Sequence, residues 1–330
     1  MKVPKTIGIA LSKRETAKLV FKQCQRVFQK KKVKLNLALN LTWTVLKTNK
    51  PFLQSDIIIC FGGDGSFLRV CQAIQTKTPL FLVGTGERNY LSCITASEAP
   101  KKIEEILNGQ YYTKKRTRLS SGLPRQPFAL NEIAITPAQS ATILHYELAI
   151  ENQTIWHDYS DGILICTPTG SSAYFAAAGG PRLDVDAPIV GIASLNSIEE
   201  RKKMVSSNQK KVVVKKMGSA SPIEAIIDGQ QRVTITKELE ISLAKKPVWL
   251  GFPLEKKVLK PLRMIDLTPS ARLVWQLLQS QGASTQQELI NQSGLHARSI
   301  RRALKDLLIQ KKVVKRPYSK DNRQDLYHPV

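Results

Sequence analysis

The stretch FGGDGSFLR, residues 61–69, follows an apolar run at 57–61 and precedes a segment with helical spacing. A short β-branched run without charge is typical of a buried strand in a parallel sheet, and ligands of such sheets bind where the strands end. The turn contains three glycines, Gly62, Gly63 and Gly65. Residues without a Cβ let backbone amides approach a bound anion closely. The stretch therefore predicts a strand, an anion-binding turn and a helix.

Asp64 is the one member of this turn that opposes anion binding, because its carboxylate repels phosphate oxygens. A carboxylate in such a place indicates proton abstraction or contact with a metal ion. The alternative is a structural role as the N-cap of the following helix. The turn lacks the Walker lysine and the G-x-G-x-x-G spacing of dinucleotide folds, so the turn alone leaves both interpretations open.

The composition is strongly basic. The chain has 330 residues and a formal net charge of +24, which is long enough for two or three domains. A charge of this size attracts polyanions, so nucleic acid and highly phosphorylated small molecules are the expected partners. The alternative is a surface adapted to the salt or temperature of the host.

The cysteines and histidines indicate the compartment and the metal content. The chain has five cysteines and four histidines, none in C-x-x-C or zinc-ligand spacing. An odd number of scattered cysteines argues against a secreted disulfide framework, and the histidines predict no structural zinc site. No signal peptide or run of transmembrane length is present, so we expect a cytoplasmic protein without membrane contact.

The first part of the chain alternates strands and helices, as α/β domains do. Predicted strands cover 6–11, 35–39, 57–61 and 79–83, and predicted helices cover 15–30, 67–75 and 98–107. The helix after the glycine turn adds the partial positive charge of its N-terminus where a phosphate would bind. A second flexible turn, Gly84-Thr85-Gly86, follows at the same sheet edge.

The middle of the chain predicts a mainly β domain. Its β-rich runs cover 128–135, 142–151, 162–166, 189–193, 211–215, 224–227, 233–235 and 239–243. Between two of these runs, TPTGSSAYFAAAGGP at 167–181 combines hydroxyls, small residues and a double glycine that no ordinary hairpin requires.

Two polar groups interrupt or end apolar strands in this part. Asn131-Glu132 lies within ALNEIAI, and Asp228-Gly229-Gln230 ends AIIDGQ. The structural alternatives are an edge or bulge for the first and a plain hairpin turn for the second.

Taken together and in this order, these segments resemble the NAD kinase family. The matching residues are Gly62-Gly63-Asp64-Gly65 with Leu68-Arg69, Asn131-Glu132, Asp161-Gly162, Thr167-Pro168-Thr169-Gly170-Ser171-Ser172-Ala173-Tyr174, Gly179-Gly180-Pro181 and Asp228-Gly229. The resemblance covers most of residues 1–255, and the TPTGSSAY stretch is highly specific for this family and its lipid-kinase relatives. It implies an α/β domain followed by a mainly β domain, the NAD kinase/diacylglycerol kinase-like fold.

The resemblance also implies a reaction: Mg²⁺-dependent transfer of a phosphoryl group from ATP or polyphosphate to the 2′-hydroxyl of the adenosine ribose of NAD, giving NADP. Asp64 would be the general base, and the backbone of Gly62, Gly63 and Gly65 would hold phosphates. Asn131 and Glu132 would bind the adenosine portion of NAD. The nicotinamide and adenine region would be lined by Asp161, Thr169, Ser171 and Tyr174. The expected cofactor-binding set is completed by Ser66, Arg69, Gly170 and Asp228. Phosphoryl transfer requires mainly positioning, a base and charge neutralisation, which these residue types provide.

Three segments depart from the family pattern. Ser66 replaces the usual Thr and keeps the hydroxyl. Residues 84–90, GTGERNY, stand where a Gly-Ile-Asn-like turn followed by Leu-Gly-Phe-Leu is usual. Residues 196–211 lack the segment with Pro and His that many members carry.

The tail beyond Pro261 is not explained by this resemblance. Three helices are predicted. The first covers 271–279 and the third covers 297–309. The second opens with a capping box at Ser284-Thr285-Gln286-Gln287 and stops near Gly294. The third helix has one apolar stripe, Ile300, Leu304, Leu307 and Leu308, and an opposite basic stripe, Arg298, Arg301, Arg302 and Lys305.

Two strands follow the basic helix and predict a hairpin around Lys320-Asp321-Asn322-Arg323. The tail therefore resembles the winged helix-turn-helix domains of transcription regulators. Cations on both the helix and the wing favour DNA as the partner, with Lys320 and Arg323 on the wing. The alternative is an accessory domain that binds protein through a solvated basic face.

The expected organisation is an α/β nucleotide-binding domain at 1–115, a β-rich NAD-binding domain at 116–255, a linker at 256–265 and the winged helix at 266–330. Two functions remain open. The first is an active NAD kinase whose tail binds DNA, and the second is a transcription regulator whose kinase fold only senses nucleotides. The retained Asp64 favours the first, and the altered turn at 84–90 favours the second. Both resemblances imply a homodimer or homotetramer.

Overall fold

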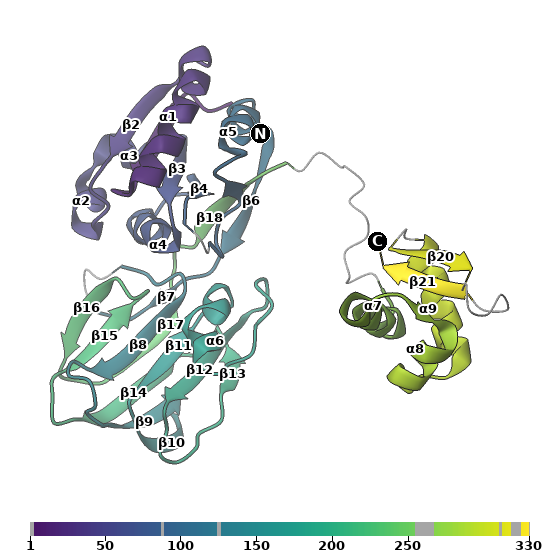
Figure 1. Cartoon of the computed structure of the whole chain (residues 1–330). Helices are drawn as coiled ribbons and strands as arrows, with labels where there is room; N and C mark the ends of the chain where they lie inside the picture. Colours follow the sequence, from purple (N-terminus) through teal and green to yellow (C-terminus); the bar gives the residue numbers. More distant parts are fainter. Residues whose placement is uncertain are drawn as a thin grey trace. The chain divides into compact units, whose positions relative to one another are not determined.

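The chain forms two compact units that divide after Leu254 (Figure 1). The computed structural model describes residues 3–86, 89–123, 127–254, 267–309, 312–317 and 325–329. The predicted linker at 256–265 and the predicted wing residues Lys320 and Arg323 lie outside these described residues.

The first unit begins with a seven-stranded sheet in the order β2-β1-β3-β4-β18-β6, with β5 paired to β4. Its strands are β1 (Thr6–Leu11), β2 (Lys34–Ala38), β3 (Ile57–Gly62), β4 (Pro79–Gly84), β5 (Ile94–Thr95), β6 (Tyr111–Arg116) and β18 (Val248–Pro253). All pairs are parallel except β6 with β18. The predicted α/β domain is confirmed, but β18 comes from a segment that the sequence places in the second domain.

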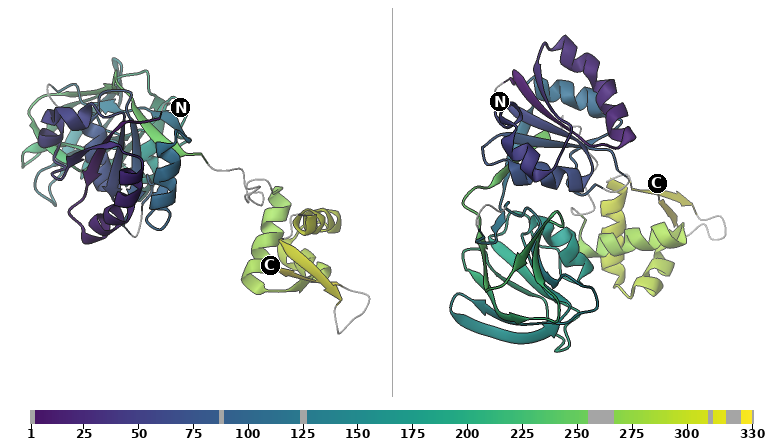
Figure 2. Two further views of the ribbon diagram at one scale, coloured as in Figure 1. Left: turned by 90° about the horizontal axis from the view of Figure 1, so that it is seen from above. Right: turned by 90° about the vertical axis from the view of Figure 1, so that its left-hand side faces the viewer.

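Helices cover both faces of this sheet (Figure 2). They are α1 (Glu15–Lys30), α2 (Trp43–Thr48), α3 (Lys50–Leu53), α4 (Asp64–Ala73) and α5 (Ala99–Leu107). Successive residues of β3 alternate between two cores, because Ile57 and Ile59 pack with α1 and α5 while Ile58 and Cys60 pack with α2, α3 and α4. Burial on both faces explains why this strand is apolar without interruption.

The rest of the first unit is a sandwich of two antiparallel sheets around one apolar core (Figure 2). One sheet has the order β10-β9-β14-β17-β7 and the other β13-β12-β11-β8-β15-β16. The strands are β7 (Leu119–Ser120), β8 (Glu132–Pro137), β9 (Leu144–Ile150), β10 (Gln153–Ser160), β11 (Gly162–Cys166), β12 (Ile189–Leu195), β13 (Met204–Ser207), β14 (Val212–Gly218), β15 (Ile223–Ile227), β16 (Gln231–Ile235) and β17 (Leu239–Leu243).

The mainly β second part is thus confirmed, and two of its motif segments differ in detail from the prediction. Asn131-Glu132 does not interrupt a strand, because β8 begins at Glu132 and residues 128–131 are irregular apart from a bridge at Ala129. The short helices η1 (Thr169–Ser172) and α6 (Tyr174–Ala177) lie in the TPTGSSAY segment, and Phe175 packs on the outer face of the six-stranded sheet.

Arg118 attaches α4 to the sandwich. Its side chain is fully buried, and its Nη1 donates to the carbonyl oxygens of Cys71 at 2.7 Å and Ile74 at 2.9 Å, at the end of α4. Its Nε and Nη2 donate to the carbonyl oxygen of Lys246 at 2.9 and 2.6 Å, just before β18. The guanidinium also stacks over the ring of Phe128. A cation at the C-terminus of a helix is favourable, because the helix dipole is negative there.

The second unit has three helices and one sheet in the order β19-β21-β20. Its elements are α7 (Pro269–Gln281), β19 (Ser284–Thr285), α8 (Gln286–Ser293), α9 (Ala297–Ile309), β20 (Val313–Pro317) and β21 (Asp325–Pro329). Gly282 ends α7 and Gly294, with φ +66°, ends α8, as the sequence predicts. The capping box is formed by Thr285 and Glu288, one residue later than predicted.

We predict that Arg118→Met lowers the free energy of unfolding of the first unit by about 3 kcal/mol, because several buried carbonyl oxygens lose their donor. Urea unfolding of the full chain measures this. Arg26→Met, at an exposed arginine on α1, is the matched control and should change stability little. Equal stabilities of the two variants would contradict the role of Arg118.

Candidate active site

The glycine turn connects β3 to α4 and leaves the N-terminus of α4 open. Gly63 is the N-cap, in an extended conformation, and no side chain caps the helix. Asp64 is the first helical residue, so the alternative interpretation of Asp64 as the N-cap is wrong. A Cβ at Gly63 or Gly65 would meet no atom closer than 3.5 Å, whereas one at Gly62 would come within 2.9 Å of Ser66. Gly62 is therefore needed for packing, and Gly63 and Gly65 present bare backbone to the exterior.

This turn forms one side of a cavity of about 880 Å³. The cavity is lined by Arg14, Glu15, Thr16, Gly63, Asp64, Gly65, Thr85, Gly86 and Asn89. The lining residues come from the carboxyl ends of β1, β3 and β4, where ligands of parallel sheets bind. We call it the glycine-turn pocket.

The Asp64 carboxylate is held by the turn that departs from the family pattern. Its Oδ2 accepts a hydrogen bond from the amide of Tyr90 at 2.8 Å, and its Oδ1 accepts one from Leu91 at 3.1 Å. The same segment is fixed to β3 by the amide of Thr85, which donates to the carbonyl oxygen of Gly62 at 3.0 Å. Glu87 and Arg88 of this turn lie outside the described residues. Each carboxylate oxygen accepts one of these hydrogen bonds and keeps a further lone pair for a ligand.

Asp228 organises the loop that carries Asn131 and Glu132. The Asp228 carboxylate accepts the amides of Leu130 at 2.9 Å, Asn131 at 2.7 Å and Glu132 at 3.2 Å. Gln72 of α4 donates to the same carboxylate at 3.2 Å. Burial raises the pKa of Asp228 to about 6, although these hydrogen bonds favour the charged form. Asp228 lies in the turn of the β15–β16 hairpin, as the structural alternative predicts, and its carboxylate in addition ties α4 to the sandwich.

Glu132 and Asn131 each keep a buried atom free for a ligand. Among the described residues, Oδ1 of Asn131 and Oε2 of Glu132 are buried and have no hydrogen-bond partner. Buried polar groups are normally paired, so such atoms indicate a missing partner. Burial, together with the Asp228 carboxylate, raises the pKa of Glu132 to about 8. A Glu132 side chain that is protonated near neutral pH can donate a hydrogen bond to a neutral acceptor.

The TPTGSS segment packs directly on this loop. Oγ1 of Thr167 donates to the carbonyl oxygen of Leu130 at 2.6 Å, and the amide of Thr167 donates to that of Asn131 at 2.8 Å. A Cβ at Gly170 would overlap the backbone of Asn131, so only glycine fits there. Oγ of Ser171 accepts the amide of Leu183 at 2.9 Å and donates to the carbonyl oxygen of Pro168 at 2.8 Å. These contacts hold Asn131 in place from behind.

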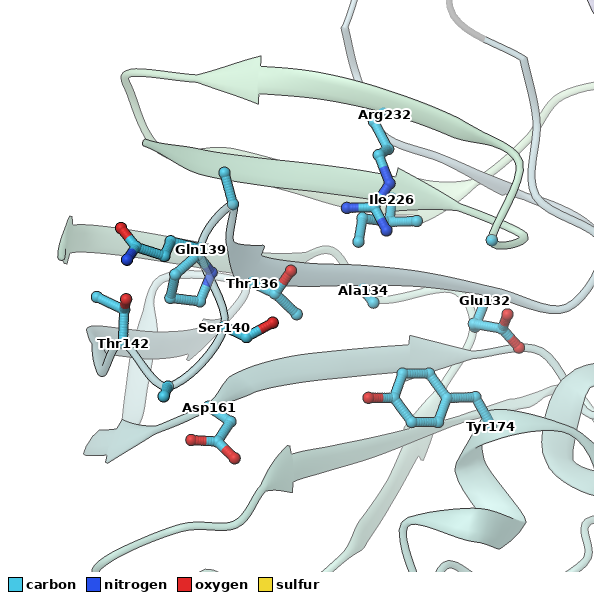
Figure 3. Close-up of a pocket in the computed structure, with 14 residues that line it drawn as sticks. Glu132, Ala134, Thr136, Gln139, Ser140, Thr142, Asp161, Tyr174, Ile226 and Arg232 are labelled. Atoms are coloured by element: carbon cyan, nitrogen blue, oxygen red, sulfur yellow. The ribbon is translucent and has the colours of Figure 1, made fainter. Parts of the chain in front are cut away.

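A second cavity of about 460 Å³ opens on the outer face of the six-stranded sheet (Figure 3). Glu132 and Tyr174 lie at one end and Asp161, Ser140 and Thr142 at the other, with Arg232 above the strand that carries Ala134. Asp161 also accepts the side-chain amide of Asn196 at 2.7 Å. We call this cavity the sheet pocket.

The predicted residues divide between these two cavities. Gly63, Asp64 and Gly65 line the glycine-turn pocket, whereas Glu132, Asp161 and Tyr174 line the sheet pocket. Asn131, Thr169, Gly170, Ser171 and Asp228 are buried behind the latter. Ser66 and Arg69 lie on α4 and line neither cavity. The sequence did not single out Arg14 or Arg232, since isolated arginines in a basic chain carry no local signal.

Gly65 and Gln230 connect the two cavities. Nε2 of Gln230 lies 3.6 Å from the position that a Cβ would take at Gly65. Gln230 follows Asp228 and Gly229, and Gly229 lines the sheet pocket. The turn at 228–230 therefore lies beside the glycine turn, and the cavities flank this contact.

Comparison with known proteins assigns this arrangement to a family. Residues 8–111 match the ATP-NAD kinase N-terminal domain, and residues 130–248 match the ATP-NAD kinase C-terminal domain. The chain belongs to the ATP-NAD kinase family. Both cavities are lined by residues within the two matched segments.

Relatives and solved structures agree with this assignment. An NAD kinase of Azotobacter vinelandii is 31% identical over 202 residues, 58% of this chain and 68% of the relative. An NAD kinase of Ectopseudomonas mendocina is 32% identical over 201 residues, with the same coverage. The fold is similar to that of an Archaeoglobus fulgidus NAD kinase in complex with ATP, with a TM-score of 0.66, 21% identity and coverage of 76% of this chain and 94% of the other. A yeast NADH kinase complexed with NADH has a TM-score of 0.65 and 17% identity, covering 78% and 86%.

Within the part of the chain that the structure describes, no helix is long and apolar enough to cross a membrane. In the same residues, no group of three His, Cys, Asp or Glu side chains is placed to hold a metal ion.

We predict that Glu132→Gln flattens the pH dependence of stability between pH 6 and 8. Folding raises the pKa of Glu132 to about 8. At a pH between the ordinary pKa of a glutamate and this raised value, the folded state therefore binds more protons than the unfolded state, and stability falls as the pH rises. One titrating group changes the unfolding free energy by up to about 1.4 kcal/mol per pH unit. Gln removes this titration, while Asp228 continues to titrate near pH 6 in both proteins.

Urea unfolding without ligand at pH 6, 7 and 8 measures the slope. Glu199→Gln, at an exposed carboxylate, is the control and should retain the slope of the unaltered protein. Identical slopes for all three proteins would show that Glu132 ionises normally in the folded state.

Proposed function

We propose that this chain, a phosphotransferase of the NAD kinase family, transfers the terminal phosphoryl group of ATP or polyphosphate to the 2′-hydroxyl of the adenosine ribose of NAD. The observation that carries this is the adjacency of two cavities with different chemistry. The glycine-turn pocket offers backbone amides and Asp64, and the sheet pocket offers Glu132, Asp161 and Tyr174. The Gly65–Gln230 contact between them lets a donor and an acceptor meet at Asp64.

Asp64 acts as the general base in this proposal. The O–H bond of the ribose hydroxyl breaks, and its proton passes to the carboxylate. A bond forms between the ribose oxygen and phosphorus while the bond to the leaving phosphate breaks. The amides of Tyr90 and Leu91 hold the carboxylate, so little reorganisation is needed when the substrates bind.

NAD binds through the sheet pocket. The free buried oxygens of Asn131 and Glu132 are available for polar atoms of the adenosine portion. Tyr174 is 44% exposed at the mouth and offers a ring against which a planar base can stack. Thr169, Gly170, Ser171 and Asp228 support this surface from behind, whereas Ser66 and Arg69 contribute through α4.

Mg²⁺ fits this site as a companion of the donor phosphates. Mg²⁺ usually keeps several waters and uses one or two carboxylates together with substrate phosphates, so a preformed cage of protein ligands is not required. Asp64 is the carboxylate that the glycine-turn pocket offers for it, since that of Glu15 is engaged by Lys18 at 2.6 Å. When bound, the ion would neutralise charge on the phosphates.

The alternative, a nucleotide sensor without catalysis, is not favoured. A sensor has no need for a base, yet Asp64 is fixed in position at the meeting point of the cavities. The altered turn, which argued for a sensor, supplies the amide of Tyr90, and the adjoining Leu91 supplies the second amide that holds Asp64.

We also propose that the second unit is a winged helix that binds DNA. Three helices with a three-stranded sheet, and α8 joined to α9 through Gly294, support this assignment. On α9, the side chains of Ile300, Leu304 and Leu307 are buried, whereas Arg298, Arg301, Arg302 and Lys305 are exposed. An exposed cationic helix face with an adjacent hairpin fits phosphate contact and a major groove. The alternative is a protein partner for the same face of α9, and the DNA-binding experiment below distinguishes it from DNA.

We predict that Asp64→Asn lowers kcat for NADP formation by about a hundredfold or more, because the proton has no acceptor. Purified protein is incubated with NAD, Mg²⁺ and either ATP or polyphosphate, and NADP is measured. Asp184→Asn, at an exposed carboxylate outside both cavities, is the control and should retain activity. No NADP from the unaltered protein with either donor would refute the proposed reaction, and full activity of Asp64→Asn would refute the base.

We predict that Arg301→Ala with Arg302→Ala weakens DNA binding and reduces the slope of log K against log salt by about two. Lys22→Ala with Arg26→Ala, on exposed positions of α1, removes the same charge from the other unit and controls for the net charge of +24. Fluorescence anisotropy of labelled duplex DNA over a salt series measures both. Equal slopes for the two double variants would mean that DNA binds by net charge alone, and retention of affinity would favour a protein partner for α9.

A further inference from the structure

Arg14 and Asp64 both line the glycine-turn pocket, from different connections of the sheet. Arg14 is the N-cap residue of α1, directly before Glu15 and Thr16, and all three line the cavity. Its Nη1 lies 3.7 Å from the position that a Cβ would take at Gly86. The guanidinium therefore extends over the second flexible turn toward the glycine turn.

The guanidinium of Arg14 has no acceptor among the described residues. Its backbone amide donates to Oγ of Ser12 at 3.4 Å, but the structure gives no hydrogen bond or ion pair of its side chain. The two carboxylates that line the pocket are engaged elsewhere, Glu15 with Lys18 and Asp64 with the amides of Tyr90 and Leu91. Arg14 is also the only cationic side chain among the described residues that line this pocket.

The pocket contains further groups that await a polar ligand. Among the described residues, Oγ1 of Thr85 and Oδ1 of Asn89 are buried and have no hydrogen-bond partner. Neither α1 nor α4 is capped by a side chain at its N-terminus. A cation, uncapped amides and an unpaired hydroxyl on three sides of one cavity match a phosphate group.

Electrostatics decides which phosphate this is. A phosphoryl group that lies within reach of Asp64 is repelled by its carboxylate, so a cation in the same pocket is required to hold it there. Arg14 supplies this cation from the β1–α1 connection, whereas the lining of the sheet pocket comes from residues 132–232. In the proposed reaction, the phosphates nearest to the reacting centre belong to the donor, and the pyrophosphate of NAD extends from the acceptor side.

We propose that Arg14 binds the terminal phosphates of the phosphoryl donor and positions them opposite Asp64. The identification of the bound molecule as the phosphoryl donor rests on the proposed reaction, whereas the binding of phosphate by Arg14 does not. The guanidinium contacts the polyphosphate chain, so ATP and inorganic tripolyphosphate are bound alike, whereas AMP, which ends at its α-phosphate, is not recognised by Arg14.

The experiment compares Arg14→Gln, Arg14→Lys and Lys13→Gln in the full chain. Lys13 is exposed, neighbours Arg14 and does not line the pocket, so it controls for the loss of one charge. Calorimetric titration with ATP, tripolyphosphate and AMP measures affinity without turnover. Steady-state kinetics then measure KM for the donor and for NAD separately.

We expect Arg14→Gln to weaken ATP and tripolyphosphate binding by roughly tenfold or more, as for loss of a charge-assisted hydrogen bond, and to raise KM for the donor by a similar factor. AMP binding and KM for NAD should not change. Arg14→Lys should recover part of the affinity, because it keeps the charge and loses the planar fork. Lys13→Gln should behave as the unaltered protein.

The inference would be overturned by unchanged affinity of Arg14→Gln for ATP and tripolyphosphate, by an equal loss with Lys13→Gln, or by a rise confined to KM for NAD. Absence of any tripolyphosphate and ATP binding by the unaltered protein would also overturn it. A failure of the proposed reaction appears differently, because the unaltered protein would then form no NADP while the binding difference between Arg14→Gln and Lys13→Gln persisted.

Discussion

The buried carboxylate of Asp228 is the contact on which the arrangement of the site depends. It accepts hydrogen bonds from three successive backbone amides, those of residues 130–132, so the backbone of this loop faces Asp228. The side chains of Asn131 and Glu132 consequently keep oxygens free at the site. The fourth donor, Gln72, belongs to α4, whose first residue is Asp64. One carboxylate thus fixes both the loop of the sheet pocket and the helix that carries the proposed base.

Helix α4 is held near its C-terminus by two contacts that use different chemistry, the carboxylate of Asp228 on Gln72 and the guanidinium of Arg118. At the C-terminus of α4, Arg118 places a buried guanidinium against the carbonyl oxygens of Cys71 and Ile74, and it forms no ion pair with a carboxylate among the residues that the structure describes. Burial lowers the pKa of Arg118 to about 10, which still leaves it charged at neutral pH. Four carbonyl oxygens and the negative end of the helix dipole offset the loss of hydration. Because the C-terminus is anchored in this way, the N-terminus can remain uncapped toward the glycine-turn pocket.

The sequence predicted the parts of the fold whose burial follows from the local pattern. Strand β11 occurs at 162–166 as predicted, and β3 and β4 extend one residue beyond their predicted ends. These strands could be predicted because a short uninterrupted apolar run fits a strand that is covered on both faces. Strand β10 was missed, since Gln153–Ser160 is polar, largely exposed and defined by its pairing with β9. Strand β18 pairs with β4, far away in the sequence, and no local pattern predicts such a return. Local motifs likewise singled out Asp64, Glu132 and Tyr174. They did not reveal the partners of Arg118 or the position of Arg14 in the glycine-turn pocket, because both depend on contacts between distant parts of the sequence.

The turn at 84–90 shows how a segment can depart from the expected sequence and still form its contacts through the backbone. Its side chains differ from the family pattern, yet its contacts with the glycine turn are made by backbone amides: Thr85 to Gly62, and Tyr90, with the adjoining Leu91, to Asp64. Any residue except proline supplies such an amide, so the chain path constrains this segment more strongly than residue identity. A carboxylate held by backbone keeps its position whatever side chains the turn carries. The side chains of the turn are then free to vary without loss of these contacts.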